Sequence, residues 1–246
     1  MTDEIVILGL NYGAHDTSAC LMKNGKLIAA CEQERYTKQK HTRDFPIDAI
    51  NDCLKKANMS INDIHEIALS WDPKLLQEEN FENIISPSRK NFKIKDLKKL
   101  KELRSQDFNL ENFIRQELNF TGRITSHLHH LCHLASCYYP SGFNDALIIC
   151  HDAVGEIDCS LMATASKGNI SIFHRGNQWP NSLGLLYAAI TDYLGWKYNS
   201  DEGIVMGLAP YGDDTQFIKS GEKTYREIFK EIIFPDEFNY EIDRTW

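Results

Sequence analysis

One pattern of apolar runs and polar loops occurs twice in this chain, and it restricts the fold more than any other feature. Residues 4–10 (EIVILGL) form a short β-branched run ending at the polar loop NYGAHDTSA, and the sequence CLMKNGKLIAACEQE follows with a hairpin turn at Asn24-Gly25. Residues 145–176 repeat this order about 140 residues later, with a Gly-containing acidic loop and a turn at Gly168. A three-strand unit used twice predicts two α/β lobes of like architecture.

The segments after the first hairpin predict how the first lobe continues. DFPIDAINDCLKKANM places Ile47, Ile50 and Leu54 at helical spacing behind Pro46, which suits a first helical turn. IHEIALSW is typical of a fourth strand. The first lobe therefore has the predicted order βββαβ.

A charged, helix-prone stretch separates the two repeats. Between about residues 87 and 120 a Leu/Phe/Ile stripe follows one helical face, which predicts an amphipathic surface insertion rather than a binding segment. We accordingly place the first lobe at residues 1–143 and the second, apparently incomplete, lobe at 144–246.

Composition excludes several classes of protein. A chain of 246 residues with 42% hydrophobic content can bury a large core. Acids outnumber bases 35 to 27, so no basic face for nucleic acid is expected. The sequence has no apolar run long enough to span a bilayer and no signal-peptide pattern, and its seven scattered cysteines form no CxxC pair. We expect a cytoplasmic protein with reduced thiols that does not bind membranes.

The stretch HLHHLCHLASCYY, residues 127–139, is rich in histidine. If it is helical, His129 and His133 lie four residues apart on one face, a spacing that lets two imidazoles reach one metal ion. Asp152, after the first strand of the second repeat, is the candidate third ligand, and such a set suits Fe(II), Mn(II) or Zn(II). The alternative is that these histidines pack, cap or face water, and spacing alone favours that alternative.

The loops after the two first strands, NYGAHDTSA and HDAVGEID, are candidates for binding phosphate. Small side chains and backbone N–H groups in such turns can surround an anion, and Gly155 lies in the second loop. Ordinary turn chemistry is the alternative for each loop taken alone. The segment MGLAPYG is predicted to be a turn, in which Gly207 and Gly212 permit close backbone approach and Pro210 adds stiffness.

Four collinear motifs resemble the NodU/CmcH-type O-carbamoyltransferase family. They are GLNYGAHDTSACLMKNGKLIAACEQERYTKQKHTRDFP, HHLCHLASCYYPSGF, NSLGLLYAAITDYLGW and EGIVMGLAPYG. The resemblance implies a Kae1-like domain of the actin/sugar kinase/Hsp70 fold. In this family a YrdC-like domain makes carbamoyl adenylate from carbamoyl phosphate and ATP, and the Kae1-like domain transfers the carbamoyl group to a substrate hydroxyl at a metal site.

The resemblance also implies roles for individual residues. His129, His133 and Asp152 match the family's metal ligands, with iron expected first and zinc or manganese as alternatives. His15, followed by Asp16, matches a histidine that looks catalytic and is suited to act as a base on a hydroxyl.

The resemblance further implies which residues meet the nucleotide or phosphate. Lys40 matches a lysine expected near a phosphate, with a solvated loop lysine as the alternative. By resemblance Gly207 and Gly212 border the active cleft, where they are expected to contact the cofactor, and Gly155 is expected to do so from the loop of the second repeat. The family usually has a lysine where this chain has Ile204, a departure that puts phosphate affinity in doubt.

Three functions remain open at this stage. The first is the N-terminal part of a carbamoyltransferase that acts on a small hydroxyl-bearing acceptor. The chain would be either a fragment of a longer protein or one half of a split enzyme, completed by a second chain that supplies the missing lobe and the YrdC-like domain. The second is a non-catalytic metal- or nucleotide-binding module. The third is an ATPase or kinase of the same fold.

Overall fold

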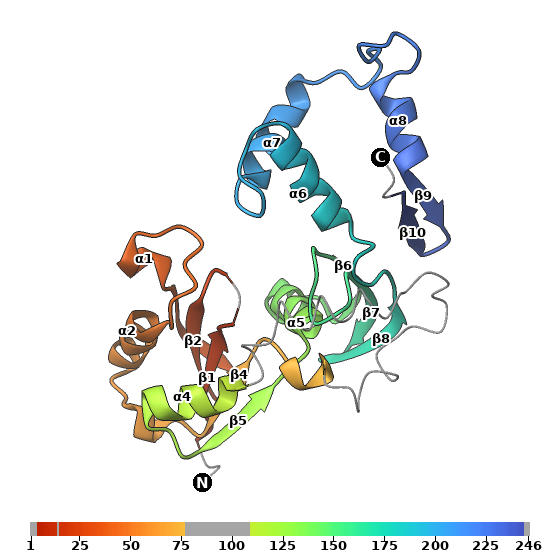
Figure 1. The fold of residues 1–246 in the computed structure, drawn as a ribbon. Helices are drawn as coiled ribbons and strands as arrows, with labels where there is room; N and C mark the ends of the chain where they lie inside the picture. The colour runs from red at the N-terminus through yellow and green to blue at the C-terminus, as the bar shows by residue number, and fades with distance from the viewer. Residues whose placement is uncertain (1–3, 14, 77–108, 244–246) are drawn as a thin grey trace. The chain divides into compact units, whose positions relative to one another are not determined.

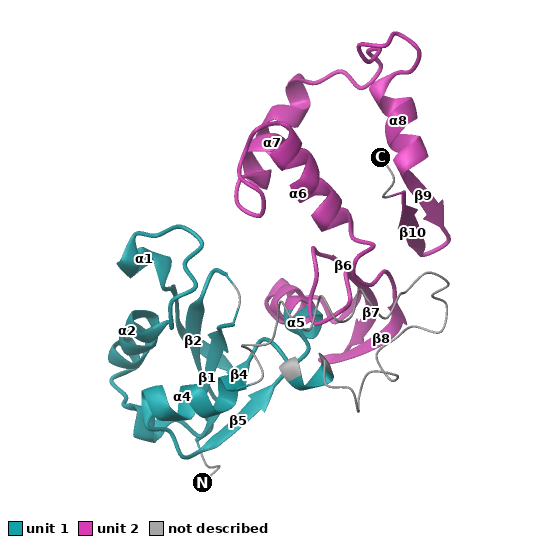
Figure 2. Ribbon diagram, viewed as in Figure 1, with its two compact units in different colours: residues 1–132 teal, residues 133–246 magenta. Residues whose placement is uncertain are grey.

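The structure is a computed structural model that describes residues 4–13, 15–76 and 109–243. It divides into two compact units, residues 1–132 and 133–246 (Figure 2). The division falls inside the helix that precedes the boundary predicted at 143/144, and the domain limits expected from the sequence stay a prediction. Within the described residues, no helix is long and apolar enough to cross a membrane.

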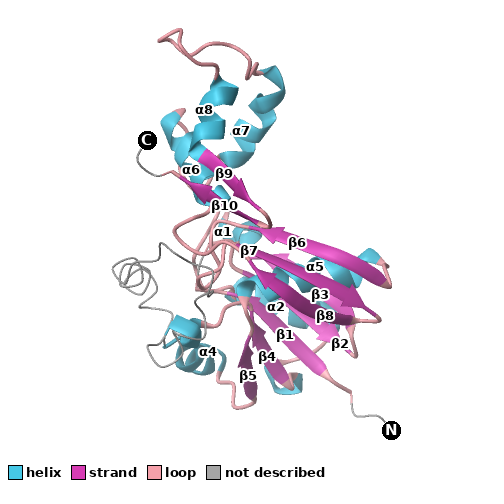
Figure 3. Cartoon of the chain, turned by 90° about the vertical axis from the view of Figure 1, so that its right-hand side faces the viewer, coloured by secondary structure: helices cyan, strands magenta, loops and turns pink. Residues whose placement is uncertain are grey.

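The first unit is built on a five-stranded sheet of order β3-β2-β1-β4-β5. Figure 1 labels β2, β1, β4 and β5 of this sheet. Its strands are β1 (Val6–Asn11), β2 (Ser18–Lys23), β3 (Lys26–Glu32), β4 (Glu66–Leu69) and β5 (Arg123–Ser126). The first three strands pair antiparallel, whereas β4 pairs parallel with β1 and β5 parallel with β4. The central strands β1 and β4 lie side by side, as Figure 3 also shows.

The core of the first unit follows the alternation of β1. Val6, Leu8 and Leu10 are buried, because successive side chains of a strand point to opposite faces of the sheet. Helix α2 (Ile47–Ala57) contributes Ile50 and Leu54 to the same core. The predicted order βββαβ is confirmed.

Shorter helices complete the first unit. They are α1 (Glu34–Thr37), η1 (Ile61–Asp63), η2 (Pro73–Leu76) and α4 (Leu110–Leu118). Most of the predicted insertion near 87–120 lies outside the described residues. Where its end is described, α4 buries Leu110, Ile114 and Leu118, so the apolar stripe of that portion faces the core as predicted.

The second unit repeats the opening of the first. Its strands β6 (Asp145–His151), β7 (Ser160–Ser166) and β8 (Asn169–Arg175) form an antiparallel sheet of order β6-β7-β8. The register shifts at Leu21/Met22 between β2 and β3, and at Met162/Ala163 between β7 and β8. A register shift in the second strand of each unit, within one residue of the matching position, supports the duplication predicted from the sequence. The mixed α/β class, with the repeated βββ unit expected for the actin/sugar kinase/Hsp70 fold, is confirmed.

The remaining elements of the second unit are helices and one hairpin. They are α5 (His129–Ser141), which begins in the first unit, then α6 (Leu183–Tyr193), α7 (Glu202–Leu208), η5 (Ala209–Tyr211), α8 (Tyr225–Ile232), β9 (Ile233–Asp236) and β10 (Asn239–Ile242). The hairpin is attached to the chain at the start of α6, since the carbonyl oxygen of Tyr240 accepts from Asn181 Nδ2 at 2.7 Å and its hydroxyl accepts from the backbone N–H of Leu183 at 3.1 Å.

Truncation of a side chain in the first core tests this assignment. Leu8 is fully buried, so Leu8→Ala should lower the free energy of unfolding by about 2–5 kcal/mol. Leu27 in the same sheet is 63% exposed, and Leu27→Ala should change it by less than about 0.5 kcal/mol. Urea unfolding of both variants provides the comparison. Equal losses would show that β1 does not supply the core.

Candidate functional site

Asn11, the last residue of β1, anchors the polar loop that follows it. Its Nδ2 donates to the carbonyl oxygens of His15 at 3.3 Å and Asp16 at 2.9 Å. Its Oδ1 accepts from Ser70 Oγ at 2.8 Å and Trp71 Nε1 at 3.2 Å, both directly after β4. One amide therefore ties the loop to the ends of two neighbouring strands.

The two predicted catalytic residues contact each other. The Nδ1 atom of His15 lies 2.7 Å from Asp16 Oδ2, and Asp16 holds a left-handed backbone conformation with φ of 58°. Asp is among the residues that tolerate this conformation. The other carboxylate oxygen of Asp16, Oδ1, lies 2.8 Å from Nδ1 of His41.

The electrostatics of Asp16 favour the ionised carboxylate. Partial burial acts to raise the pKa of Asp16, but the hydrogen bonds from His15 and His41 outweigh it, so this pKa lies below its usual range. Sequence reasoning missed His41, although it directly follows Lys40 in the motif ERYTKQKH. Lys40 is exposed, and its phosphate-binding role stays a prediction.

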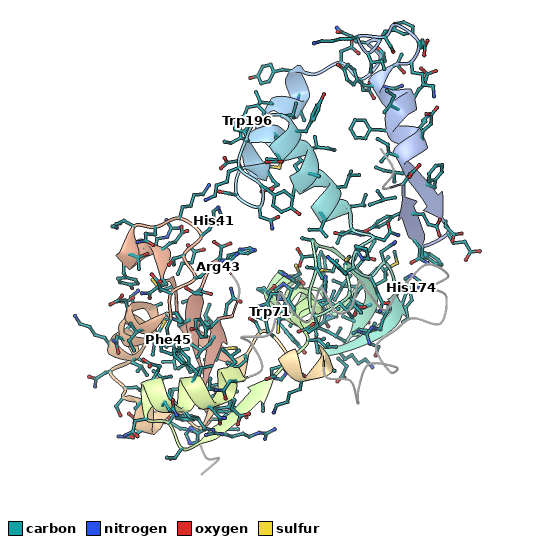
Figure 4. All side chains as sticks on the ribbon, in the orientation of Figure 1. His41, Arg43, Phe45, Trp71, His174 and Trp196 are labelled. Atoms are coloured by element: carbon teal, nitrogen blue, oxygen red, sulfur yellow. The ribbon has the colours of Figure 1, made fainter. Side chains whose placement is uncertain are left out.

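Helix α5 carries the predicted metal histidines, and its sequence is helical as predicted. His129 is the first residue of the helix; its Nδ1 lies 3.3 Å from the carbonyl oxygen of Ser70. Its ring stacks on Trp71, with centroids 3.8 Å apart and planes 16° apart (Trp71 is labelled in Figure 4). A hydrogen bond at Nδ1 and a stacked ring fix the orientation of the imidazole.

His133, one turn later, meets Asp152 of the loop after β6. Its Nε2 lies 3.6 Å from Asp152 Oδ2. Their interaction raises the pKa of His133 above its ordinary value, against the lowering effect of burial. The three residues His129, His133 and Asp152 each offer one ligand atom, and these atoms lie within 4.8 Å of one another. Because one continuous helix carries both histidines, their spacing is set by the helix itself.

Asp152 is held by contacts from the start of α6. The Ser182 hydroxyl donates to the carbonyl oxygen of Asp152 at 3.0 Å, and Asp152 Oδ1 accepts from the backbone N–H of Ala153 at 2.7 Å. Gly184 packs so closely that an added Cβ would lie 2.6 Å from the backbone nitrogen of Ala153. Any larger residue at 184 would displace this loop. No sequence pattern identified Ser182 or Gly184 as support for the site.

This donor set consists of two imidazoles and one carboxylate whose ligand atoms are close enough to bind one ion. Such a set suits Fe(II), Mn(II) or Zn(II). The residues present therefore fit the metal that the family resemblance implies. The structure brings together the three predicted metal ligands, and separately the predicted pair His15 and Asp16. The roles assigned to these residues stay predictions.

The predicted cofactor glycines have different local settings. Gly155 is buried in the loop after β6, where its backbone N–H donates to the carbonyl oxygen of Asp158 at 2.8 Å. Gly207 lies within α7, and a Cβ added there would meet no atom of the described residues within 4 Å. Gly212 directly follows η5. No described contact tests their binding role.

The segment MGLAPYG is helical over most of its length and does not form the expected turn. A turn was predicted, whereas α7 continues to Leu208 and η5 follows directly. Pro210 lies in the first turn of η5, where a missing N–H costs no hydrogen bond, so it is compatible with a helix start. Ile204, the position that departs from the family, lies in α7 and is 45% exposed.

The chain matches a protein family described as Carbamoyltransferase N-terminus over residues 6–244. It is 33% identical over 215 residues to an uncharacterized protein of Synechocystis, covering 84% of this chain and 35% of that protein. It is also 33% identical over 203 residues to nodulation protein NolNO of Sinorhizobium fredii, covering 82% of this chain and 28% of that protein.

The chain spans about a third of the length of these curated relatives. Among solved structures, YeaZ from Pseudomonas aeruginosa aligns with a TM-score of 0.36 at 12% identity, covering 69% of this chain and 65% of that one. The Ppx/GppA family member of Aquifex aeolicus aligns with a TM-score of 0.35 at 9% identity, covering 76% and 54%.

The contact between His133 and Asp152 predicts a pH dependence in the metal-free protein. With a raised folded pKa, protonated His133 stabilises the fold fully below the unfolded value near 6.5, and this contribution is lost as pH rises through the folded pKa. Asp152→Asn should lower the pKa of His133, measured by NMR titration in the presence of chelator. Asp236→Asn, in β9, should leave it unchanged. Identical titration of His133 in both variants would contradict the assigned contact.

Proposed function

The chain belongs to the carbamoyltransferase N-terminal family, and on this premise we propose that it supplies the transfer half of an O-carbamoyltransferase. The substrates would be carbamoyl adenylate and a hydroxyl of a sugar or another small natural product. The observation that carries the proposal is the contact of His15 with Asp16, since transfer to a hydroxyl needs a base and this pair provides one.

His15 would act as the general base. Its Nδ1 is held by Asp16, so in the neutral tautomer with hydrogen on Nδ1 the Nε2 atom is the proton acceptor. The acceptor oxygen then bonds to the carbamoyl carbon while its proton passes to Nε2. The bond from that carbon to the adenylate phosphate oxygen breaks, and AMP leaves. The ionised Asp16 stabilises the imidazolium that forms.

His129, His133 and Asp152 would hold a divalent metal, iron first and zinc or manganese as alternatives. When bound, the metal would serve as a Lewis acid towards the carbamoyl carbonyl. The chain's own contribution is to orient the ligands. Ser70 and Trp71 fix the ring of His129, and Ser182 fixes the backbone of Asp152.

We propose further that carbamoyl adenylate is made from carbamoyl phosphate and ATP by a separate domain, on a second chain or on another segment of a longer protein. An apolar groove of about 940 Å³ in the second unit supports such a partner. It runs between α6 and α8, which face it with Leu186, Ile190, Ile228 and Phe229. Apolar grooves of this kind are common at protein interfaces.

Replacement of the base tests the proposal. Carbamoyl adenylate with ¹³C in the carbamoyl group is generated in the assay by a separate adenylate-forming enzyme, and acceptor sugars are offered as a pool. His15→Asn should lower AMP release and ¹³C-carbamate formation by about 10²–10⁴-fold, the usual contribution of a positioned base.

His174→Asn provides the matched control, because His174 lies in β8 and its Nε2 contacts Asn239. This variant should keep the parent rate. The proposal fails if the parent chain releases no more AMP than the assay without it, or if His15→Asn is as active as the parent.

A further inference from the structure

His41 contacts the predicted catalytic pair without belonging to the loop that carries it. Its Nδ1 lies 2.8 Å from Asp16 Oδ1, while the other carboxylate oxygen lies 2.7 Å from Nδ1 of His15. The two imidazole rings are nearly perpendicular, at 89°, with centroids 6.3 Å apart. The carboxylate of Asp16 therefore bridges two histidines, one on each oxygen.

The hydrogen-bond chemistry fixes which nitrogen of His41 carries hydrogen. An ionised carboxylate only accepts, so Nδ1 must donate. The Nε2 atom of His41 is buried, and among the described residues no hydrogen-bond partner meets it. The neutral tautomer with hydrogen on Nδ1 leaves no N–H at that buried position, where an unsatisfied donor would be costly. His41 is thus built as a donor to Asp16.

The exposure of the two histidines differs in a way that suits different roles. The side chain of His15 is 51% exposed, whereas that of His41 is 26% exposed. A base must be accessible to its substrate, whereas a group that only positions another side chain needs no such access. The more exposed ring is therefore the candidate to exchange a proton with an acceptor, and the less exposed ring is the candidate to orient the carboxylate between them.

The segment that carries His41 is attached to the loop at more than this one contact. The backbone N–H of His41 donates to Glu34 Oε2 at 3.1 Å. Two further hydrogen bonds join the loop to the residues that follow His41. The Thr17 hydroxyl donates to the carbonyl oxygen of Asp44 at 2.8 Å, and the Thr17 backbone N–H donates to the carbonyl oxygen of Thr42 at 3.4 Å. Thr17 is fully buried. His41 thus has a fixed position relative to Asp16. Figure 4 shows where it lies in the first unit.

We propose that His41 is a positioning residue for carbamoyl transfer: it holds the Asp16 carboxylate in the orientation that keeps hydrogen on Nδ1 of His15 and leaves Nε2 of His15 to take the proton of the acceptor hydroxyl. This inference rests on the proposed function. It adds a third member to the pair expected from the sequence, acting through Asp16 and without contact to substrate.

A metal ion is the competing explanation for this cluster, because His15, Asp16 and His41 also offer ligand atoms within 4.8 Å of one another. In the structure, however, the Nδ1 atoms of both histidines are used in hydrogen bonds to the carboxylate. A metal at these nitrogens would have to displace both protons. The two explanations differ in metal content and in the tautomer of His15.

The test compares His41→Ala, His41→Asn and the control Gln39→Ala, an exposed position two residues away. The Asn side chain can place an amide N–H near the position of Nδ1 and so restore the donor. Long-range ¹H–¹⁵N spectra of the metal-free full chain, labelled with ¹⁵N-histidine, report the tautomer of His15. Thermal unfolding of each variant verifies that it folds.

The expected result is hydrogen on Nδ1 of His15 in the parent and in Gln39→Ala, and a shift towards the other tautomer in His41→Ala. The rate constant for transfer at saturation should fall by about 10- to 100-fold in His41→Ala, as when another imidazole loses its supporting partner, with little change in KM. His41→Asn should recover most of the rate and the parent tautomer.

Three results would overturn the proposal: a folded His41→Ala with the parent tautomer and rate, a His41→Asn no better than His41→Ala, or loss of one bound metal equivalent from the untreated protein on replacing His41. The spectra separate this proposal from the function on which it rests. If the parent chain transfers no carbamoyl group but His41→Ala still changes the tautomer of His15, the proposed function fails and the positioning of His15 by His41 stands.

Discussion

The side chain of Asn11 is the contact on which the positions of the loop after β1 and of the residues after β4 depend. Its amide nitrogen holds the carbonyl oxygens of His15 and Asp16, and its amide oxygen holds Ser70 and Trp71. Those last two residues in turn orient His129 by a hydrogen bond and a stacked ring. The candidate base and the first candidate metal ligand are therefore both supported, directly or through one intermediate, by a single amide at the end of β1. An amide can do this because it offers both donors and acceptors.

In the second unit, different groups hold the loop that follows the first strand. The loop after β6 carries Asp152 and is held by Ser182 and by the close approach of Gly184 at the start of α6. In both units a loop after the first strand gains its position from residues far along the chain. The duplication thus preserves the strand order and the place of the loop, whereas the residues that fix each loop differ. This agrees with the general rule that loops vary more than the strands they connect and carry most binding and catalytic residues.

Features with a local signature could be predicted from the sequence. The strand at residues 4–10, the turn at Asn24-Gly25 and the helical spacing of His129 and His133 depend on residues within a few positions, and all three are confirmed. His41 and Gly184 could not be found this way, because their partners lie 25 or more residues away and share no periodicity with them. The prediction of a turn over Met206 to Gly212 was wrong, because glycine and proline mark both turns and helix starts and the local sequence does not distinguish them.

The central claim is that helix α5 and the loop after β6 form a metal site, and metal content tests it most directly. Elemental analysis of the protein purified without chelator is compared between the parent, the double variant His129→Ala, His133→Ala, and a control in which His127 and His174 are both replaced by alanine. The account predicts near-stoichiometric iron, zinc or manganese in the parent and the control, and none in the double variant. Equal metal in all three proteins, or none in the parent, would contradict it.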